Sequence, residues 1–123
     1  MNVMSWQYIA GLVDGEGCIQ LIKAKKFWYP SISISQKNQS FLQLLKQEIG
    51  FGCIAGNNYT VANRNATKFL EFTLPYLVIK RSEAELLNHA LLILKHKSRR
   101  YCQPTIEREL TEISETLKIC HLK

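Results

Sequence analysis

The sequence predicts a single α+β domain in which helices alternate with pairs of antiparallel strands. Three observations support this fold class. The chain has 123 residues, of which 46% are hydrophobic, and this suits one domain with one core. Segments with apolar residues at helical spacing alternate with short strand-like segments, and turn-forming residues separate them. We expect one four-stranded antiparallel sheet with helices on one face, a core over about 5–97 and a helical extension over 104–123.

The first elements are a helix and a strand pair. A helix is predicted over 5–15, because Ser5 is a suitable N-cap, apolar residues follow at helical spacing, and glycines end it. Strands are predicted over 19–24 and 31–36, and in the second of them isoleucines alternate with serines. The aromatic-rich segment 25–30 is predicted to connect them.

The middle of the chain repeats this order. Asn38 is a candidate N-cap for a helix that ends at Gly50. A second strand pair is predicted over 52–55 and 59–62, because the Gly-Asn-Asn sequence at 56–58 is a strong turn signal.

The last third is predicted to be helical. Asn65 is the expected cap of a helix that ends before Pro75. Ser82 and Glu85 form a candidate capping box for a long helix, and Pro104 is expected to open the last one.

The charge predicts a polyanionic partner. Lys and Arg number 16 against 10 Asp and Glu, which gives a net charge of +6. There is no acidic residue between Glu16 and Glu48 or between Glu85 and Glu107, whereas the stretch from Glu107 onward nets −1 (three bases, four acids). A basic body favours DNA, RNA or an anionic surface. No apolar run approaches the roughly 20 residues of a membrane span, so no membrane role is expected.

The cysteines and histidines do not have zinc-site spacing. No two cysteines form a C-x-x-C pair, and the histidines lack ligand spacing. We expect buried, reduced thiols and hence an intracellular protein. The residues concerned are Cys18, Cys53, Cys102, Cys120, His89, His96 and His121.

Residues 9–17 combine small residues with acids at the end of a predicted helix. Gly11 and Gly15 share one helix face, although glycine costs about 1 kcal/mol relative to alanine in a helix. This pattern suggests close approach of another backbone, such as the same helix of a second copy. Asp14 and Glu16 lie at the negative end of the helix dipole, which suggests a bound Mg²⁺, Ca²⁺ or Mn²⁺.

The segment Ile9–Gly17, Ile-Ala-Gly-Leu-Val-Asp-Gly-Glu-Gly, resembles the LAGLIDADG motif of the homing endonuclease family. Its departures are conservative, with Ile, Val, Gly and Glu in place of Leu, Ile, Ala and the last Asp. A second similarity is the Pro-Tyr-Leu-x-Ile-Lys sequence at 75–80. The resemblance covers roughly 6–95. It implies an αββαββα fold with a saddle-shaped sheet and an intron-encoded, sequence-specific DNA endonuclease.

The resemblance also implies roles for individual residues. Glu16 matches the metal ligand at the scissile phosphate, with Gly15 beside it. Lys80 matches a lysine that polarises the attacking water, and Gln36 matches a polar residue of the same pocket. Asp14 matches a structural acid that ties the helix end to a neighbouring turn.

One departure concerns the pocket, where Ser40 stands in place of an expected basic residue. Lys37 or Arg81 could compensate for it. The implied metal is Mg²⁺, with Mn²⁺ as a substitute and Ca²⁺ expected to bind without supporting cleavage.

One motif per chain implies a homodimer that makes one cut per strand, staggered, in a long pseudo-palindromic duplex. The motif and dimer-helix residues are Ala10, Gly11, Asp14 and Gly15. Candidate DNA contacts are polar or basic side chains on or near the strands. They are Gln20, Lys23, Lys25, Lys26, Ser31, Ser33, Ser35, Lys37, Asn57, Asn58, Thr60, Asn63 and Arg64.

Two alternatives remain open for the same fold. The first is an RNA maturase that binds its intron during splicing, and the second is a DNA-binding regulator that does not cleave. The presence of Glu16, Gln36 and Lys80 together favours the nuclease. The compartment stays open between the cytoplasm or nucleoid and an organelle.

Overall fold

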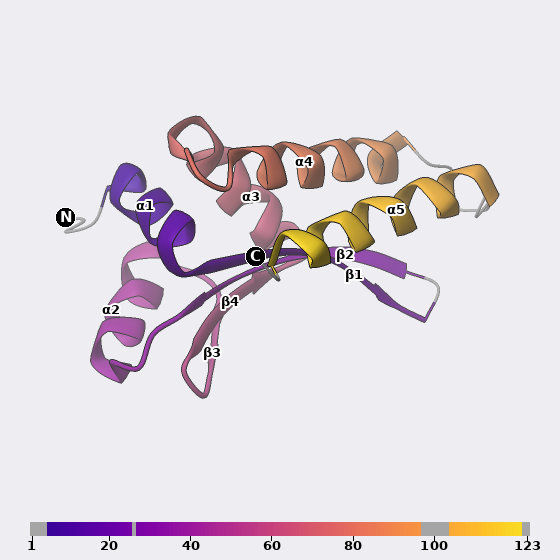
Figure 1. The fold of residues 1–123 in the computed structure, drawn as a ribbon. Helices are drawn as coiled ribbons and strands as arrows, with labels where there is room; N and C mark the ends of the chain where they lie inside the picture. Colours follow the sequence, from indigo (N-terminus) through magenta and orange to yellow (C-terminus); the bar gives the residue numbers. More distant parts are fainter. Residues whose placement is uncertain (1–4, 26, 97–103, 122–123) are drawn as a thin grey trace.

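The structure is a computed structural model that describes residues 5–25, 27–96 and 104–121. Its elements follow the predicted order and confirm the α+β fold class (Figure 1). They are α1 (Trp6–Glu16), β1 (Gly17–Ala24), β2 (Phe27–Ser35), α2 (Gln39–Ile49), β3 (Cys53–Ala55), β4 (Asn58–Ala62), α3 (Arg64–Thr73), the 3-10 turn η1 (Leu74–Tyr76), α4 (Arg81–His96) and α5 (Pro104–His121).

The four strands form one antiparallel sheet in the order β1-β2-β4-β3. Alternate side chains point to opposite faces, so each strand separates into an apolar and a polar set. Ile19 and Leu21 of β1 and Ile32 and Ile34 of β2 are buried on one face. In Figure 1, α1, α3 and α4 lie on one side of the strands. The core therefore lies between this face and the helices.

The other face, here called the open face, carries small and polar side chains near the end of β2 and the aromatic side chains of Tyr29 and Phe27 toward the β1–β2 turn. The strand register aligns Cys18, Ser33, Thr60 and Cys53 in one row across all four strands. A parallel row places Gln20 opposite Ser31. This alternation matches the prediction made from the serines of β2.

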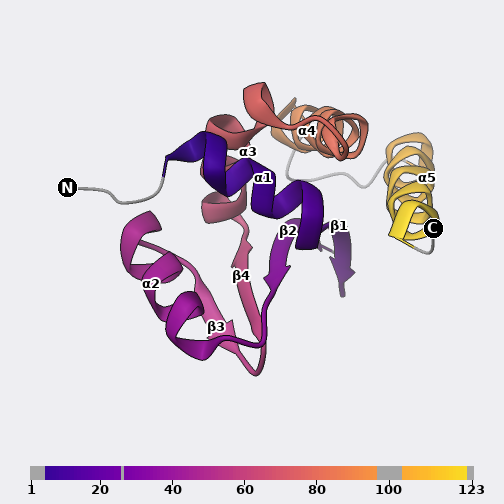
Figure 2. The same cartoon turned by 60° about the vertical axis from the view of Figure 1, so that its left-hand side comes forward.

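Helix α5 covers the free edge of β1 (Figure 2). Its apolar stripe is buried through Leu110, Ile113 and Leu117. The Ser114 hydroxyl donates a 2.8 Å hydrogen bond to the carbonyl oxygen of Leu21. An exposed strand edge invites pairing with other chains, and this helix prevents it along β1.

Several predicted helix ends are confirmed. Ser5 caps α1 by accepting a hydrogen bond from the Tyr8 N–H, at 3.1 Å. Asn38 caps α2 in the same way, and Gly50 ends that helix with a left-handed φ of 91°. In the described part of the chain, no helix is both long and apolar enough to cross a lipid bilayer.

Other predicted boundaries were wrong. Strand β2 begins at Phe27, so the aromatic segment continues the hairpin arm instead of forming a long connection. Helix α3 begins one residue after Asn63, which takes a positive φ of 58°, and so Asn65 lies inside the helix. Helix α4 begins at Arg81, and this places Ser82 within its first turn.

The expectation of uniformly buried thiols was also wrong. Cys53 is exposed on β3 and Cys18 is half-buried on the open face. Cys102 lies outside the described residues, as do Lys26 and the basic residues at 97–100. The placement of the Cys120, His96 and His121 side chains also lies outside the description.

Candidate active site and nucleic-acid interface

The Asp14 carboxylate joins the end of α1 to the segment before α4. Its two oxygens accept hydrogen bonds from the backbone N–H groups of Val78 and Lys80, each at 2.9 Å. These donors belong to the N-terminal approach of α4, where backbone N–H groups lack helical partners. Asp14 therefore binds backbone N–H groups with both of its oxygens, which is the kind of role that the resemblance implied for this acid.

Glu16 has a different environment. It is the last residue of α1 and it is exposed. The register places Gly17 opposite Ile34, so Glu16 lies beside the end of β2, where Gln36 follows. Asp14 holds the backbone of Lys80 against the same helix end. The structure thus brings the segments that carry Glu16, Gln36 and Lys80 to one end of the first two strands.

Cys18 lies two residues after Glu16, and the pKa of its thiol depends on nearby charged side chains. Burial raises the pKa of the Cys18 thiol, the positive charge of Lys80 opposes that shift, and the negative charge of Glu83 adds to it. A hydrogen bond with Ser33 also lowers the thiol pKa. The Lys80 ammonium group and the Glu83 carboxylate are therefore both near enough to Cys18 to act on its thiol. Cys18 was expected only as a buried thiol, although its even spacing from Gln20 indicated that the two side chains share one face of β1.

The outer surface of α1 is open at both of its glycines. Among the described residues, a methyl group built on Gly11 or Gly15 would have no neighbour within 4 Å. Tyr8 stands on the same helix face, since it lies three residues before Gly11, and its side chain is 51% exposed. By contrast, Ala10 is fully buried and faces the core.

Two exposed apolar residues extend this surface and were not predicted. Val78 is 79% exposed and Ile79 is 73% exposed, in the segment that Asp14 holds. Burial in the single chain does not explain why apolar side chains stand there. The sequence offered one signal, namely two β-branched residues in a stretch without strand alternation.

Most of the expected base-reading residues lie on or beside the open face. Strand alternation places Gln20, Ser31, Ser33, Ser35, Asn58 and Thr60 there, but Ser31 is only 6% exposed and is buried in the chain. The Ser35 hydroxyl donates a 2.6 Å hydrogen bond to Asn58 Oδ1, and the Gln39 amide donates to Asn57 Oδ1 at 2.9 Å. Hydrogen bonds between neighbours order these side chains before any ligand arrives.

The basic candidates are more scattered. Lys37 is exposed just after β2, Lys25 is exposed at the tip of the β1–β2 hairpin, and Arg64 follows β4 together with the neutral Asn63. Lys23 differs, because it lies three residues after Gln20 on β1 and its side chain therefore points to the opposite, helix-covered side of the sheet. There its ammonium group pairs with Glu107 of α5.

The position of the missing basic residue is exposed. Ser40 lies in the first turn of α2, and Lys37 is exposed three residues earlier. The Arg81 guanidinium pairs with Glu85 at 3.1 Å along α4. Of the two possible substitutes, Arg81 is therefore already engaged with an acid on its own helix, whereas Lys37 is exposed beside the start of α2.

The donor chemistry of the helix end suits a hard divalent cation. Glu16 offers an exposed carboxylate, and carbonyl oxygens in the last turn of a helix, including that of Gly15, have no partner further along it. Oxygen ligands suit Mg²⁺, Mn²⁺ or Ca²⁺. Within the described residues no three His, Cys, Asp or Glu side chains gather into a metal site.

The architecture is that of known solved structures. The homing endonuclease I-CvuI in complex with its target, in the presence of 2 mM Ca, matches with a TM-score of 0.76 at 22% identity over 93% of this chain and 80% of that one. The LAGLIDADG meganuclease I-AabMI bound to uncleaved DNA matches with a TM-score of 0.74 at 21% identity over 90% and 44%. This chain has the LAGLIDADG endonuclease fold. The homing endonuclease I-TnaI matches with a TM-score of 0.65 at 18% identity over 93% and 98%.

The coverage distinguishes two sizes of neighbour with the LAGLIDADG fold. This chain spans nearly all of I-TnaI but less than half of I-AabMI. No protein-family model matches the sequence, and no curated protein matches it. The single LAGLIDADG-like segment of this chain agrees with the smaller size.

Proposed function

We propose that the chain is a homodimeric LAGLIDADG homing endonuclease that cleaves long, pseudo-palindromic double-stranded DNA with the aid of a divalent metal ion. The observation that carries the proposal is the end of α1. There, an exposed glycine surface, an exposed terminal carboxylate and the lysine segment held by Asp14 occur together. The DNA complexes among the structural neighbours support the choice of substrate.

The glycine surface supports the dimer. Because a methyl group on Gly11 or Gly15 would meet nothing in the part of the chain that the structure describes, alanine at both positions would favour the helix by up to about 1 kcal/mol each. Their absence of side chains is explained if the α1 helices of two copies pack backbone to backbone, as small residues permit. Val78 and Ile79 would then be buried at the same interface, which would explain why these apolar side chains are exposed in the single chain.

The dimer would bring two Glu16 carboxylates together at its axis. These carboxylates and the helix-end carbonyl oxygens of Gly15 would hold the metal ions near the two scissile phosphates. A bound divalent ion supplies charge stabilisation and a more acidic water at such a site. The ammonium group of Lys80 would add positive charge beside the phosphate, and the Gln36 amide would orient the attacking water by hydrogen bonding.

The open face would lie in the major groove on either side of the cut. Its serine, threonine and amide side chains present the donors and acceptors that read base edges. Lys25, Lys37 and Arg64 would contact phosphates and contribute to affinity in any sequence. A two-fold axis through the α1 pair predicts half-sites of related sequence.

One observation keeps the non-cleaving DNA regulator as a second candidate. Ser40 is exposed where the family resemblance implies a basic pocket residue. If Lys37 does not replace that charge, binding would persist and cleavage would fail. The RNA maturase has no structural feature in its favour beyond the shared fold.

The test is a cleavage selection on a randomised pseudo-palindromic duplex library, in Mg²⁺ or with a chelator. We expect recovery of a symmetric long site that is cut only with metal, and loss of cutting in Glu16→Gln. Glu71→Gln is the matched control, because it removes the same charge from an exposed position on α3. Enrichment of bound but uncut duplexes would replace the nuclease with the regulator. An absence of DNA enrichment, with retention of structured RNA, would favour the maturase.

A further inference from the structure

A single carboxylate on α5 binds side chains of both strands near the tip of the β1–β2 hairpin. Lys23 of β1 and Trp28 of β2 are paired directly across the two strands. The Lys23 ammonium group binds Glu107 Oε1, and the Trp28 indole N–H donates to Glu107 Oε2 at 3.1 Å. The same ammonium group lies 5.5 Å from the centre of the Trp28 ring. We call this group of three residues the clamp.

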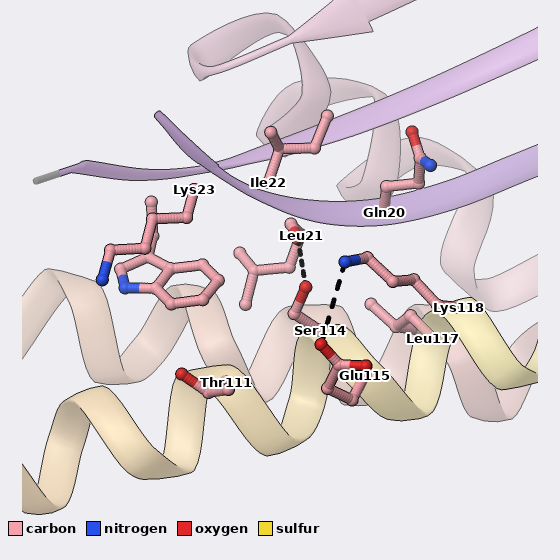
Figure 3. A pocket seen from close by; sticks show the side chains of 10 residues that line it. Gln20, Leu21, Ile22, Lys23, Thr111, Ser114, Glu115, Leu117 and Lys118 are labelled. Atoms are coloured by element: carbon pink, nitrogen blue, oxygen red, sulfur yellow. Dashed lines mark hydrogen bonds and ion pairs between the residues drawn. The ribbon is translucent and has the colours of Figure 1, made fainter. Parts of the chain in front are cut away.

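Apolar packing between α5 and the hairpin is incomplete behind the clamp. A partly open cavity of about 310 Å³ lies along the contact between β1 and α5, and residues of both elements line it (Figure 3). On its β1 side the second attachment is the hydrogen bond from Ser114 to the Leu21 carbonyl oxygen. Beside a cavity the arm has fewer packing contacts to hold it, so polar contacts have a larger share in fixing its position.

The hairpin tip beyond the clamp carries exposed side chains that face outward. Phe27 is 75% exposed and belongs to the open-face set, because it alternates with Trp28. Lys25 is exposed at the turn with a positive φ of 59°. In the proposed complex the tip lies farthest from α1 and therefore reaches the outermost base pairs of each half-site.

We propose that Glu107 is a positioning residue that sets selectivity at the outer base pairs of the half-site through the clamp. This inference rests on the proposed function. The carboxylate fixes Lys23 and Trp28 at once, so it fixes both strands of the arm and the tip beyond them. Lys23 is therefore assigned to the clamp instead of to a phosphate contact.

The variants separate this role from charge and from folding. Glu107→Gln removes the ion pair, and Trp28→Phe removes the indole N–H together with part of the ring while it keeps an aromatic side chain and the net charge. Glu112→Gln is the matched control, because it makes the same charge change at an exposed position of α5. Any general gain in DNA affinity from the lost negative charge is shared by the control.

The readout is the base preference recovered at each position of the randomised duplex library. We expect preference at the outer positions to fall roughly threefold to tenfold in Glu107→Gln, and by less in Trp28→Phe, as loss of one or two polar contacts predicts. Preference at the central positions and the cleavage rate of the best site should stay unchanged. Glu112→Gln should leave the whole profile unchanged.

A measurement without DNA tests the clamp independently of the proposed function. Amide hydrogen exchange of residues in β1 and β2 should accelerate at the arm in Glu107→Gln and not in Glu112→Gln. Faster exchange with an unchanged outer preference would overturn the selectivity role, and unchanged exchange would overturn the clamp itself. If the unaltered protein selects no DNA, the proposed function fails and the selectivity role fails with it, whereas the exchange result still decides whether the clamp orders the arm.

Discussion

The Asp14 carboxylate accepts the backbone N–H of Lys80 across 66 residues of sequence, at 2.9 Å. The bond places a negative group at the start of α4, where the helix dipole favours it, and at the end of α1, where the dipole disfavours it. The favourable interaction with the start of α4 offsets the unfavourable one with the end of α1. Lys80 is consequently held at the end of α1 by its own backbone, which leaves its side chain available for the site.

We predict opposite effects on stability from two neighbouring acid-to-amide changes. Asp14→Asn loses charged acceptance of two backbone N–H groups and should lower the free energy of unfolding by about 1–3 kcal/mol. Glu16→Gln removes a charge from an exposed helix end, so it should leave stability equal or slightly higher. Urea unfolding of both variants measures this. Equal stabilities would contradict the structural role assigned to Asp14.

Two glycines of the motif should respond differently to alanine. A methyl group on Gly17 would stand 2.6 Å from the Val13 carbonyl oxygen and 2.7 Å from its Cα, both backbone atoms that cannot move aside cheaply. We expect Gly17→Ala to destabilise the folded chain by about 1–3 kcal/mol in thermal or urea unfolding. A variant as stable as the parent would show that the end of α1 can relax.

Gly15→Ala should instead weaken association. The added methyl group has no neighbour among the residues that the structure describes, so the unfolding of the monomer at low concentration should be unchanged or slightly improved. Between two α1 helices it would push the backbones apart and raise the dimer dissociation constant about tenfold or more. Sedimentation equilibrium measures this constant. Unchanged association would place the dimer contact elsewhere on the molecule.

Local signals predicted most of the fold correctly. The cap at Ser5, the cap at Asn38 and the left-handed glycine at Gly50 each depend on neighbours in sequence, and all three are present. The errors arose where distant contacts decide. Ser82 has the sequence of a cap, but Asp14, far away in sequence, binds the N–H groups before α4 and the helix begins earlier.

In the candidate site, too, local patterns were predicted correctly and distant contacts were not. The acids of the motif and the alternation of β2 were visible as patterns. The different environments of Asp14 and Glu16 were not visible, because the motif places both at one helix end. Lys23 was expected at phosphates from its charge, whereas its partner Glu107 comes from the last helix. Only the register of β1 shows which face Lys23 occupies.

Cys18 provides a chemical probe of Lys80. Burial raises the pKa of its thiol and the charge of Lys80 opposes this shift, so removal of that charge should raise the pKa further. We expect iodoacetamide to modify Cys18 more slowly than the exposed Cys53, and more slowly still in Lys80→Gln. Peptide mass spectrometry follows each site, and the rate at Cys53 is the internal control. An unchanged Cys18 rate would place the ammonium group away from the open face.

Tyr59 predicts how stability depends on alkaline pH. Its ring is fully buried, its hydroxyl donates a 2.6 Å hydrogen bond to the Phe51 carbonyl oxygen, and burial raises its pKa well above the usual value. In the unfolded chain the group titrates near pH 10. Above that pH the unfolded state releases the proton and the folded state keeps it, so the contribution of Tyr59 to stability is complete below about pH 10 and is lost as the pH rises further.

The corresponding variant is Tyr59→Phe. It should lose about 1 kcal/mol at neutral pH, because the Phe51 carbonyl loses its donor. It should also show a shallower decline of stability above about pH 10 than the parent protein. Tyr8→Phe is the matched control, since Tyr8 is exposed, and it should keep the parental slope. Urea unfolding at a series of pH values measures both effects, and parallel slopes for all three proteins would mean that Tyr59 ionises as readily in the folded state as in the unfolded one.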